Sequence, residues 1–531
     1  MEREYIISLK KGINYDEFWN EIENLSSDDN FVPSRRVDII NNRDGSLRSC
    51  HYALTDQEAE LLIKDPRVFG VNLPPDKIPD AKIGLNAKQI SNFDKPTTSA
   101  GSNTNWGLKR CIVISNIYET NNASPSSNYD YMLDGSGVDI VIQDSGIEVN
   151  HPEFKDSSGN SRIQLINWYT EAGIAGTQNA NHYRDFDGHG THVAAIATGL
   201  TYGWAKNAHI YSMKLSGLEG AGDSGTGISI TDCFDLIKLW HQNKPIDPKT
   251  GVKRPTIVNM SWGYFTTYTS ISSLTYRGVT YTDNSTLTDE NYRWANYGLL
   301  PITDGSQYFA NRRIPSVDSD IQELIDAGVH VITAAGNRYH KVDLSAGTDY
   351  DNNYVSGGST IYYHRGSSPS AADTDAINVG NINNTVYDAS LDKKNDSSEC
   401  GPGVDIYAPG SGIISAVSNT NLYSGASYHL DSGFKQASLT GTSQAAPQVA
   451  GFAALVLQMN PRLTPNLLKQ YIINKSVSSI IYDTGLDNDW STSFTSLKGG
   501  PNKFLFSPIS IAEDENTSGD LTFENISLTL T

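Results

Sequence analysis

Four residues that together could cleave a bond by nucleophilic attack stand in short polar motifs of this sequence. Ser443 lies in GTSQAAPQVAG, where a run of small residues follows it. A serine hydroxyl becomes a strong nucleophile when a neighbouring base takes its proton and a third group orients that base. The sequence offers an acid, a histidine and an amide in comparable motifs, which are Asp144 in VDIVIQDSG, His189 in DGHGTHVA and Asn337 in VITAAGN.

Each motif taken alone also has a purely structural explanation. Ser443 would then be the N-cap of a buried helix, and the small residues after it would let that helix pack closely. Equally, a serine at a helix start can direct its backbone N–H at a developing oxyanion, with the helix dipole behind it. Asp144 also fits a turn, His189 a helix cap and Asn337 a hydrogen-bonded loop. The joint occurrence of all four motifs favours the catalytic interpretation.

The segments that must position these residues have the pattern of an α/β domain. Apolar strands are predicted within residues 137–146, 255–263, 329–337, 375–382 and 403–410, and helices within 191–200, 321–328, 464–475 and directly after Ser443. Such alternation predicts a mostly parallel sheet covered by helices. Sites in open α/β sheets form outside the carboxyl ends of the strands, which is where the candidate residues stand. Ser319 and Gln322 predict a capping box, and Thr464 a cap before Pro465.

Residues 1–76 are expected to form a separate small α+β unit. Strands are predicted at 5–9, 35–40, 47–54 and 67–73, and helices at 15–25 and 56–65, the second capped by Thr55. The resulting order βαββαβ is that of a ferredoxin-like unit. Residues 77–105 are rich in Ser, Thr, Asn, Gly and Pro and predict a linker. Residues 106–507 then form the α/β domain, and 508–531 a tail with an acidic run and a weak strand.

The composition of the 531 residues favours a folded protein and limits its partners. Hydrophobic residues make up 38% and charged residues 19% of the chain, and the net charge is −20. Nucleic acid and anionic membranes attract basic surfaces, so neither is expected as a partner. The four cysteines are widely spaced and indicate neither a disulfide scaffold nor a zinc site. Because no secretory signal and no membrane span stand out, we expect a cytoplasmic or non-classically released protein, unless a signal has been removed.

Five stretches in this order resemble the signature blocks of subtilisin-like serine proteases: DSGIEVNHPEF, DGHGTHVA, VNMSWG, VITAAGN and GTSQAAPQVAG. TYGWAKNAHIYSMK and GGPNKFLF resemble the proteinase K branch of that family. The resemblance implies a subtilisin-like three-layer domain around a mostly parallel sheet, and a serine endopeptidase that needs no cofactor for its chemistry. It implies that Ser443 is the nucleophile, His189 the general base and Asp144 the group that orients His189. Asn337 and the Ser443 N–H would form the oxyanion hole, and His192 would be a structural histidine.

The same resemblance implies where a protein or peptide substrate binds. Two walls of the primary specificity pocket would be Ser261-Trp262-Gly263 and Ala334-Ala335-Gly336, and Ser224-Gly225 would pair with the peptide as an added strand. Apolar walls with glycines favour an apolar or aromatic side chain just before the cut, although these short motifs alone also fit sheet packing. Asp405 matches a position that helps to bind calcium in the proteinase K branch, so a structural calcium ion is allowed. An exposed strand-end aspartate is the simpler explanation, and no metal ligands are assigned.

Two further features qualify the resemblance. Seventy residues separate Gly263 from Ala334, more than compact family members carry, so an insertion is expected at about 264–318. It is rich in Tyr and Thr, fits a hairpin, and would restrict access to the pocket or recruit a partner protein. YIISLK and YALTDQEAELLIKDPRVFGVN resemble the family's propeptide, although Asn72 stands where an acidic residue is usual. This implies an autoinhibited precursor that is cut within residues 74–105. The alternative is a catalytically silent subtilisin fold that serves as a structural or binding module.

Overall fold

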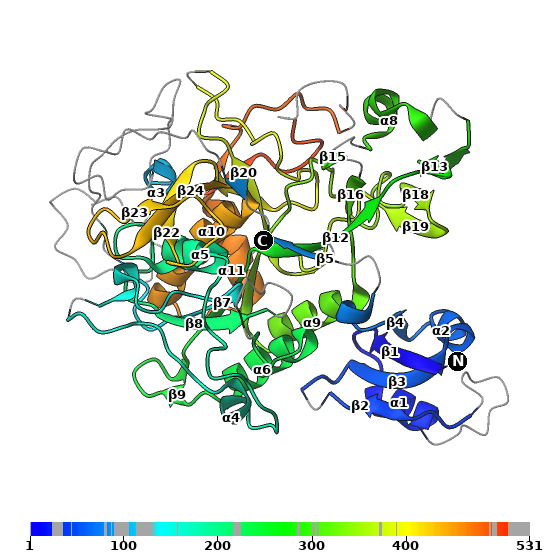
Figure 1. The fold of residues 1–531 in the computed structure, drawn as a ribbon, viewed down its shortest axis with the longest axis horizontal. Helices are drawn as coiled ribbons and strands as arrows, with labels where there is room; N and C mark the ends of the chain where they lie inside the picture. The colour runs from blue at the N-terminus through cyan, green and yellow to red at the C-terminus, as the bar shows by residue number, and fades with distance from the viewer. Residues whose placement is uncertain are drawn as a thin grey trace.

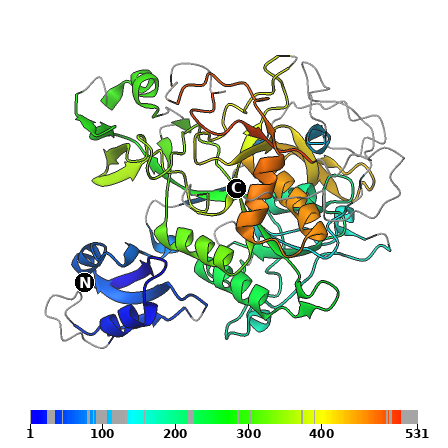
Figure 2. The same ribbon diagram turned by 180° about the vertical axis from the view of Figure 1, so that it is seen from behind.

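The computed structural model describes residues 2–23, 35–43, 45–78, 82–85, 88–89, 106–112, 131, 133–156, 158–215, 223, 225–283, 287–299, 303–304, 307–370, 374–388, 390–487, 490 and 496–507. The tail predicted at 508–531 lies outside these residues. Figure 1 shows a large body and a smaller N-terminal unit, drawn in blue, that lies against it. Figure 2 shows the same two parts from behind. No helix among the described residues is long and apolar enough to cross a membrane.

A sheet of eight strands, counted over the described residues, forms the centre of the large body. Its order is β25-β26-β21-β20-β17-β11-β7-β8, and all neighbours are parallel except β25 and β26. This is the mostly parallel sheet that the alternation of strands and helices predicts. The strands are β7 (Asp139–Asp144), β8 (His209–Lys214), β11 (Thr256–Met260), β17 (His330–Ala334), β20 (Ile377–Ile382), β21 (Ile406–Pro409), β25 (Val477–Ser478) and β26 (Lys503–Phe504).

Helices cover both faces of this sheet, which gives three layers. The helices are α5 (His189–Thr198), α10 (Thr442–Met459), α6 (Ile230–Asn243), α9 (Pro315–Asp326) and α11 (Pro465–Lys475). Alternate residues of β7 point to opposite faces, because Ile140 and Ile142 pack with α5 and α10 whereas Val141 packs with α6 and α9. Each such side chain contributes about 1.5–3 kcal/mol when it is fully buried. The three-layer architecture predicted from the sequence is therefore confirmed.

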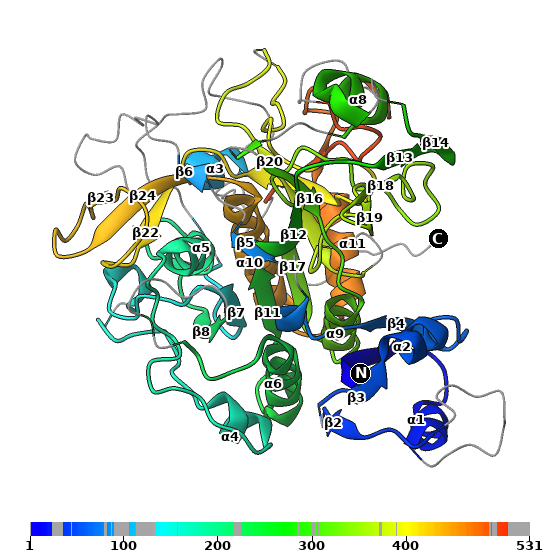
Figure 3. The same cartoon turned by 45° about the vertical axis from the view of Figure 1, so that its right-hand side comes forward.

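The N-terminal unit is a four-stranded antiparallel sheet with two helices. Its elements are β1 (Glu2–Leu9), α1 (Tyr15–Glu23), β2 (Ile39–Asn41), β3 (Ser49–Thr55), α2 (Asp56–Leu62) and β4 (Val68–Asn72), followed by the 3₁₀ turn η1 (Pro75–Lys77). The observed order is the βαββαβ order that the sequence predicts, and the sheet order is β2-β3-β1-β4. Thr55 and Glu58 form a capping box at α2. Figure 3 shows the unit next to α9 and α6 of the large body.

The segment between β11 and α9 forms an accessory lobe together with residues further along the chain. It contains β12 (Trp262–Tyr268), β13 (Ser273–Tyr276), β14 (Val279–Tyr281), α8 (Glu290–Tyr297), β15 (Thr303–Asp304) and β16 (Gln307–Asn311), and it packs with β18 (Asn353–Ser356) and β19 (Ser359–Tyr362). β13 and β14 form the expected hairpin. A cluster of buried aromatic and aliphatic side chains, which includes Tyr268, Tyr297 and Tyr354, holds the lobe together.

The remaining elements frame the sheet. They are α3 (Trp106–Arg110), η2 (Pro152–Phe154), α4 (Trp168–Ala172), β9 (Ile246–Asp247), β10 (Val252–Lys253), β22 (Ile413–Val417), β23 (Ala426–Ser427) and β24 (Lys435–Thr440). Thr464 caps α11 ahead of Pro465, as predicted. The capping box predicted from Ser319 and Gln322 is wrong. Ser319 lies inside α9, which begins at Pro315 because proline has no N–H to satisfy at a first helical position.

Two short strands lie within the segment for which the sequence predicts only a linker. They are β5 (Lys82–Leu85) and β6 (Lys88–Gln89). β5 pairs with β12, and β6 pairs with β24. The chain between the N-terminal unit and α3 is therefore tied to the large body at two places.

Candidate active site

Asp144 and His189 lie in contact at the carboxyl end of the central sheet. Asp144 is the last residue of β7, and its Oδ1 lies 2.8 Å from Nδ1 of His189, the first residue of α5. Both side chains are buried. Burial lowers the pKa of His189, but the charge and hydrogen bond of Asp144 outweigh this effect, and the pKa is raised above its ordinary value of 6.5. The pair therefore has the geometry in which a carboxylate orients an imidazole and stabilises its protonated form.

The loop before His189 is held by an aspartate that the sequence pattern did not single out. Asp185 accepts hydrogen bonds from the backbone N–H groups of Gly188 and Thr191 at 2.8 and 2.9 Å. It also accepts one from the hydroxyl of Ser145, the residue after Asp144, at 2.9 Å. One buried carboxylate thus links the end of β7 to the start of α5. The sequence gives only one indication of this role of Asp185, which is that the residue stands four positions before His189.

A close backbone approach completes this link. A Cβ atom added to Gly190 would lie 2.1 Å from the backbone oxygen of Gly146, a distance that no side chain can occupy. Gly190 therefore lets the first turn of α5 pack directly against the loop after β7. This explains why DGHGTHVA carries a glycine directly after His189.

Ser443 is the second residue of α10 and is fully buried. The N-cap of α10 is Gly441, and no side chain caps the helix. The structural explanation of Ser443 as an N-cap is therefore wrong. Its hydroxyl donates a hydrogen bond to the backbone oxygen of Ser261 at 2.8 Å, while Nε2 of His189 has no hydrogen-bond partner.

Asn337 follows β17 and faces the start of α10. Its Oδ1 accepts hydrogen bonds from the backbone N–H of Thr442 at 2.9 Å and from the Thr442 hydroxyl at 3.1 Å. The orientation of the amide is thereby determined, and no hydrogen bond of the described residues uses Nδ2 of Asn337. A free amide donor beside the N-terminus of the helix that carries Ser443 is what an oxyanion hole requires. Thr442 is a positioning residue that sequence reasoning missed.

His192 differs sharply from His189, although only three residues separate them. It is buried, and its Nε2 lies 3.1 Å from the backbone oxygens of Ile413 and Ala437. Burial lowers the pKa of His192 to about 3. The imidazole is therefore neutral and tied to β22 and β24, which agrees with the structural role expected for it.

The chain's own residues cross the site in the manner of a peptide substrate. β5 adds to the edge of β12 in antiparallel register, with Leu85 opposite Trp262 and Gly84 opposite Gly263. β6 pairs with β24 on the other side, with Lys88 opposite Thr440, three residues before Ser443. Strand addition to a sheet edge is a general mode of peptide recognition. The described ends of the two strands, Leu85 and Lys88, thus pair with residues that stand close to Ser261 and Ser443 in the sequence.

The two pocket walls implied by the resemblance stand at the ends of neighbouring strands, because β11 and β17 pair in parallel with Met260 opposite Thr333. Trp262 and Gly263 begin β12, Ser261 bonds to Ser443, and Ala334 ends β17 beside the Ala335-Gly336 turn. Of the strand-pairing residues, Gly225 has a φ of 71° and its N–H bonds to Asp223, whereas Ser224 lies outside the described residues.

A buried carboxyl group that the sequence reading missed lies behind the Gly336 wall. Glu399 accepts hydrogen bonds from Asn311 Nδ2 at 3.0 Å and from the Arg338 N–H at 3.1 Å, and its Oε2 has no partner. Burial raises the pKa of Glu399 to about 8. A Cβ added to Gly336 would lie 2.8 Å from its Cγ, so the wall and the carboxyl group touch.

The arrangement around Asp405 does not fit a calcium ion. One oxygen of its carboxylate lies 2.9 Å from the ammonium group of Lys469 and accepts a hydrogen bond from the backbone N–H of Asn378 at 2.8 Å. A cation is therefore already paired with this carboxylate. Across the described part of the chain, no group of three or more His, Cys, Asp or Glu side chains is placed to hold a metal ion. The four cysteines are free and buried.

Known proteins match most of this chain. The model of the subtilase family matches residues 135–504. Alkaline serine exoprotease A of Vibrio alginolyticus is 25% identical over 446 residues, which are 83% of this chain and 58% of that protein, so the chain spans little more than half of that relative. Subtilisin-like protease 4 of Trichophyton rubrum is 25% identical over 88% of this chain and 85% of its own length.

Among solved structures, a cold adapted subtilisin-like serine proteinase is 24% identical and matches with a TM-score of 0.46, over 78% of this chain and 100% of that one.

Proposed function

This chain belongs to the subtilase family, and from that premise we propose that it is a serine endopeptidase that uses Asp144, His189 and Ser443 as a catalytic triad. The observation that carries the proposal is the buried 2.8 Å contact between Asp144 and His189 Nδ1, which leaves Nε2 of His189 without a partner. A chain segment bound like a substrate between β12 and β24 supports the same conclusion. Protein or peptide chains are therefore the proposed substrates.

The chemistry begins when the Ser443 hydroxyl turns from the Ser261 oxygen towards His189. Nε2 takes the hydroxyl proton as Oγ bonds to the substrate carbonyl carbon, and the carbonyl electron pair moves onto oxygen. Asn337 Nδ2 and the Ser443 N–H stabilise this oxyanion. The amine then leaves with the proton from His189, and an acyl-enzyme remains. A water molecule then attacks the acyl-enzyme through the same steps, which releases the new carboxylic acid and restores the Ser443 hydroxyl.

The proposal includes synthesis as an autoinhibited precursor. While β5 and β6 occupy the edges of β12 and β24, a second peptide cannot use the same pairing positions. The pairing of Leu85 with Trp262 and of Lys88 with Thr440 supports a cut between these two strands. We propose that the enzyme cuts itself there, within the segment from 74 to 105 that the sequence indicates. The N-terminal unit then remains as a separate inhibitory fragment.

A catalytically silent fold is the competing interpretation, and hydrolysis separates the two. Purified wild-type protein and a Ser443→Ala variant are incubated with an unfolded protein substrate, and new amino termini are counted. We expect the wild type to cleave the substrate and the Ser443→Ala variant to leave it intact. An exposed serine, Ser390, offers a matched Ser→Ala control that should cleave like the wild type. A wild-type protein that makes no cut after its N-terminal unit has been removed would favour the silent fold.

A further inference from the structure

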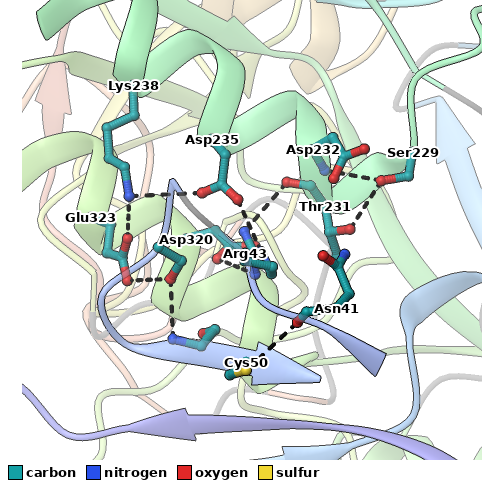
Figure 4. A network of polar contacts seen from close by, with 12 residues as sticks. Asn41, Arg43, Cys50, Ser229, Thr231, Asp232, Asp235, Lys238, Asp320 and Glu323 are labelled. Atoms are coloured by element: carbon teal, nitrogen blue, oxygen red, sulfur yellow. Dashed lines mark hydrogen bonds and ion pairs between the residues drawn. The ribbon is translucent and has the colours of Figure 1, made fainter. Parts of the chain in front are cut away.

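A buried cluster of charged side chains joins the N-terminal unit to α6 and α9. The turn between β2 and β3 inserts Arg43 between the two helices (Figure 4). The Nε of Arg43 lies 3.0 Å from Asp235 Oδ2 on α6, and its Nη1 lies 3.0 Å from Asp320 Oδ1 on α9. The guanidinium group is fully buried and also donates to the backbone oxygen of Thr231 at 3.3 Å. Among the described residues of the N-terminal unit, only Arg43 contributes a charged side chain to the cluster.

Two further charged side chains complete the cluster. Lys238 of α6 forms an ion pair with Glu323 of α9 and lies 3.7 Å from Asp235. The hydroxyl of Ser46 and the N–H of Arg48, both on the N-terminal unit, donate to Oε1 of Glu323 at 2.8 and 3.1 Å. The cluster therefore contains two cations and three carboxylates, whose side chains are between 0% and 9% exposed.

The turn that carries Arg43 lies directly against α6. A Cβ added to Gly45 would lie 2.6 Å from Cβ of Asp235, so a larger residue would lift the turn from the helix. On β4, a Cβ added to Gly70 would lie 2.5 Å from Cβ of Pro315, at the start of α9. Asn72 also donates to the hydroxyl of Ser316 at 3.1 Å. Water is therefore excluded from the charged cluster while the unit is docked.

Among the described residues, no cation other than Arg43 and Lys238 forms an ion pair with a carboxylate of the cluster. The guanidinium of Arg48 binds the backbone oxygen of Leu9, and His51 binds Glu4 within the N-terminal unit. On the helices, each remaining carboxylate has its own partner: Asp232 binds Tyr169, Asp318 binds Arg313, and Asp326 binds Lys11. Asp44 lies outside the described residues. The described cluster thus keeps one negative charge more than it has positive charges.

We propose that docking of the N-terminal unit on α6 and α9 takes up a proton, so that the unit is held more tightly at acidic than at alkaline pH. With the unit removed, Asp235 and Asp320 face water and both can be ionised. With the unit docked, burial disfavours the uncompensated negative charge, and one proton restores neutrality. A bound state that holds more protons than the free state loses affinity as pH rises. That this also controls proteolysis rests on the proposed function, whereas the docking equilibrium does not.

The titration of the two aspartates agrees with this direction. Burial raises the pKa of Asp320 to about 7 although Arg43 opposes the effect, and burial likewise raises the pKa of Asp235. An exposed aspartate has a pKa of about 4. The pKa of Asp320 is therefore higher in the docked state than in the free state. Docking should weaken as pH rises from about 4 to about 7 and then stay constant.

Hydrogen exchange on full-length Ser443→Ala protein tests the proposal without any need for catalysis. The measured quantity is the protection factor of peptides that cover residues 42–49, because the Arg48 N–H bonds to Glu323 only in the docked state. Division by the intrinsic exchange rate at each pH removes the direct effect of pH on exchange. We expect protection to fall by about 30-fold between about pH 5.5 and about pH 8, as one-proton linkage with pKa values near 4 and 7 requires.

Three variants in the Ser443→Ala background sharpen the result. Asp320→Asn removes the excess charge and should reduce the pH effect to within about twofold, and Glu323→Gln repeats this test if that variant does not fold. Arg43→Gln should lower protection at both pH values. Arg3→Gln, an exposed arginine paired with Asp56 in the same unit, is the matched control and should change nothing. Unaltered protection of β7 and β17 verifies folding. Equal protection at both pH values, or a pH effect that persists in Asp320→Asn, would overturn the proposal.

Discussion

Ser443 and Ser261 exchange two hydrogen bonds. The Ser443 hydroxyl donates to the backbone oxygen of Ser261 at 2.8 Å, and the Ser261 hydroxyl donates to the backbone oxygen of Ser443 at 3.0 Å. This reciprocal pair holds the start of α10 against the start of β12, and it directs the Ser443 proton away from His189. Activation then requires a change in the Ser443 rotamer, which a bound substrate carbonyl would favour.

The first prediction concerns this pair. Ser443→Ala should lower peptide hydrolysis by at least about 10⁴-fold, because no other hydroxyl replaces the nucleophile. Only one hydrogen bond is lost, so the free energy of unfolding should fall by about 1 kcal/mol. Turnover of a fluorogenic peptide and denaturant unfolding measure the two effects. Parent-like turnover in the variant would show that another residue is the nucleophile.

The second prediction separates the two functions of the Asn337 amide. Asn337→Leu should lower kcat by about 10²–10³-fold with little change in KM, because the donor acts mainly in the transition state. The variant also loses the acceptor for Thr442, so some stability should be lost. Asn337→Asp keeps that acceptor and still lacks the neutral donor. If Asn337→Asp retained the parent kcat, the loop after β17 would not contribute to the oxyanion hole.

The third prediction concerns the pH dependence of activity. His189 must be neutral to take the proton of Ser443, so activity should be lost as pH falls through the pKa of His189. That pKa is raised above 6.5 by Asp144, and the charges of Asp187 and Asp185 add to the effect. Asp187→Asn removes one of these charges but keeps an oxygen that accepts the hydrogen bond from the backbone N–H of His189. The acid limb of the kcat/KM profile should then move to lower pH, and a shift to higher pH would contradict this reasoning.

The fourth prediction concerns the position at which the chain cuts itself. Intact mass measurement of wild-type protein after incubation should show two fragments whose boundary lies between Leu85 and Lys88. Ser443→Ala protein should stay at full length, which also controls for contaminating proteases. A boundary before Lys82 or after Gln89 would mean that the pairing of β5 and β6 does not determine the cut.

The sequence predicts most of the scaffold because local patterns determine it. The continuous apolar run Ile140–Ile142 in β7 and the Thr464-Pro465 start of α11 are readable without tertiary information. The Asp144–His189 contact follows less directly, since it needs the order of strands in the sheet. Ser319 shows the limit of local signals, because a Ser-x-x-Gln pattern inside a helix looks the same as one at its start.

Long-range pairing accounts for most of what the sequence reading missed. Residues 82–85 offer only four residues of alternation and 88–89 none, and both segments become strands because β12 and β24 present free edges to them. Arg43 has no local pattern at all, and its role depends on carboxylates about 190 and 280 residues away, which no periodicity predicts. Glu399 is similar, because its place behind Gly336 results from the packing of two loops.

The most direct test of the central claim is covalent labelling of the self-cleaved protein with an active-site-directed phosphonate, followed by peptide mass mapping. We expect one adduct, on Ser443, formed in proportion to the loss of peptide hydrolysis. A His189→Ala variant cannot cleave itself, so its N-terminal unit is first removed with an added protease; it should then not be labelled, because the hydroxyl has no base. Loss of hydrolysis with an adduct on another residue, or full hydrolysis by protein labelled on Ser443, would contradict that claim.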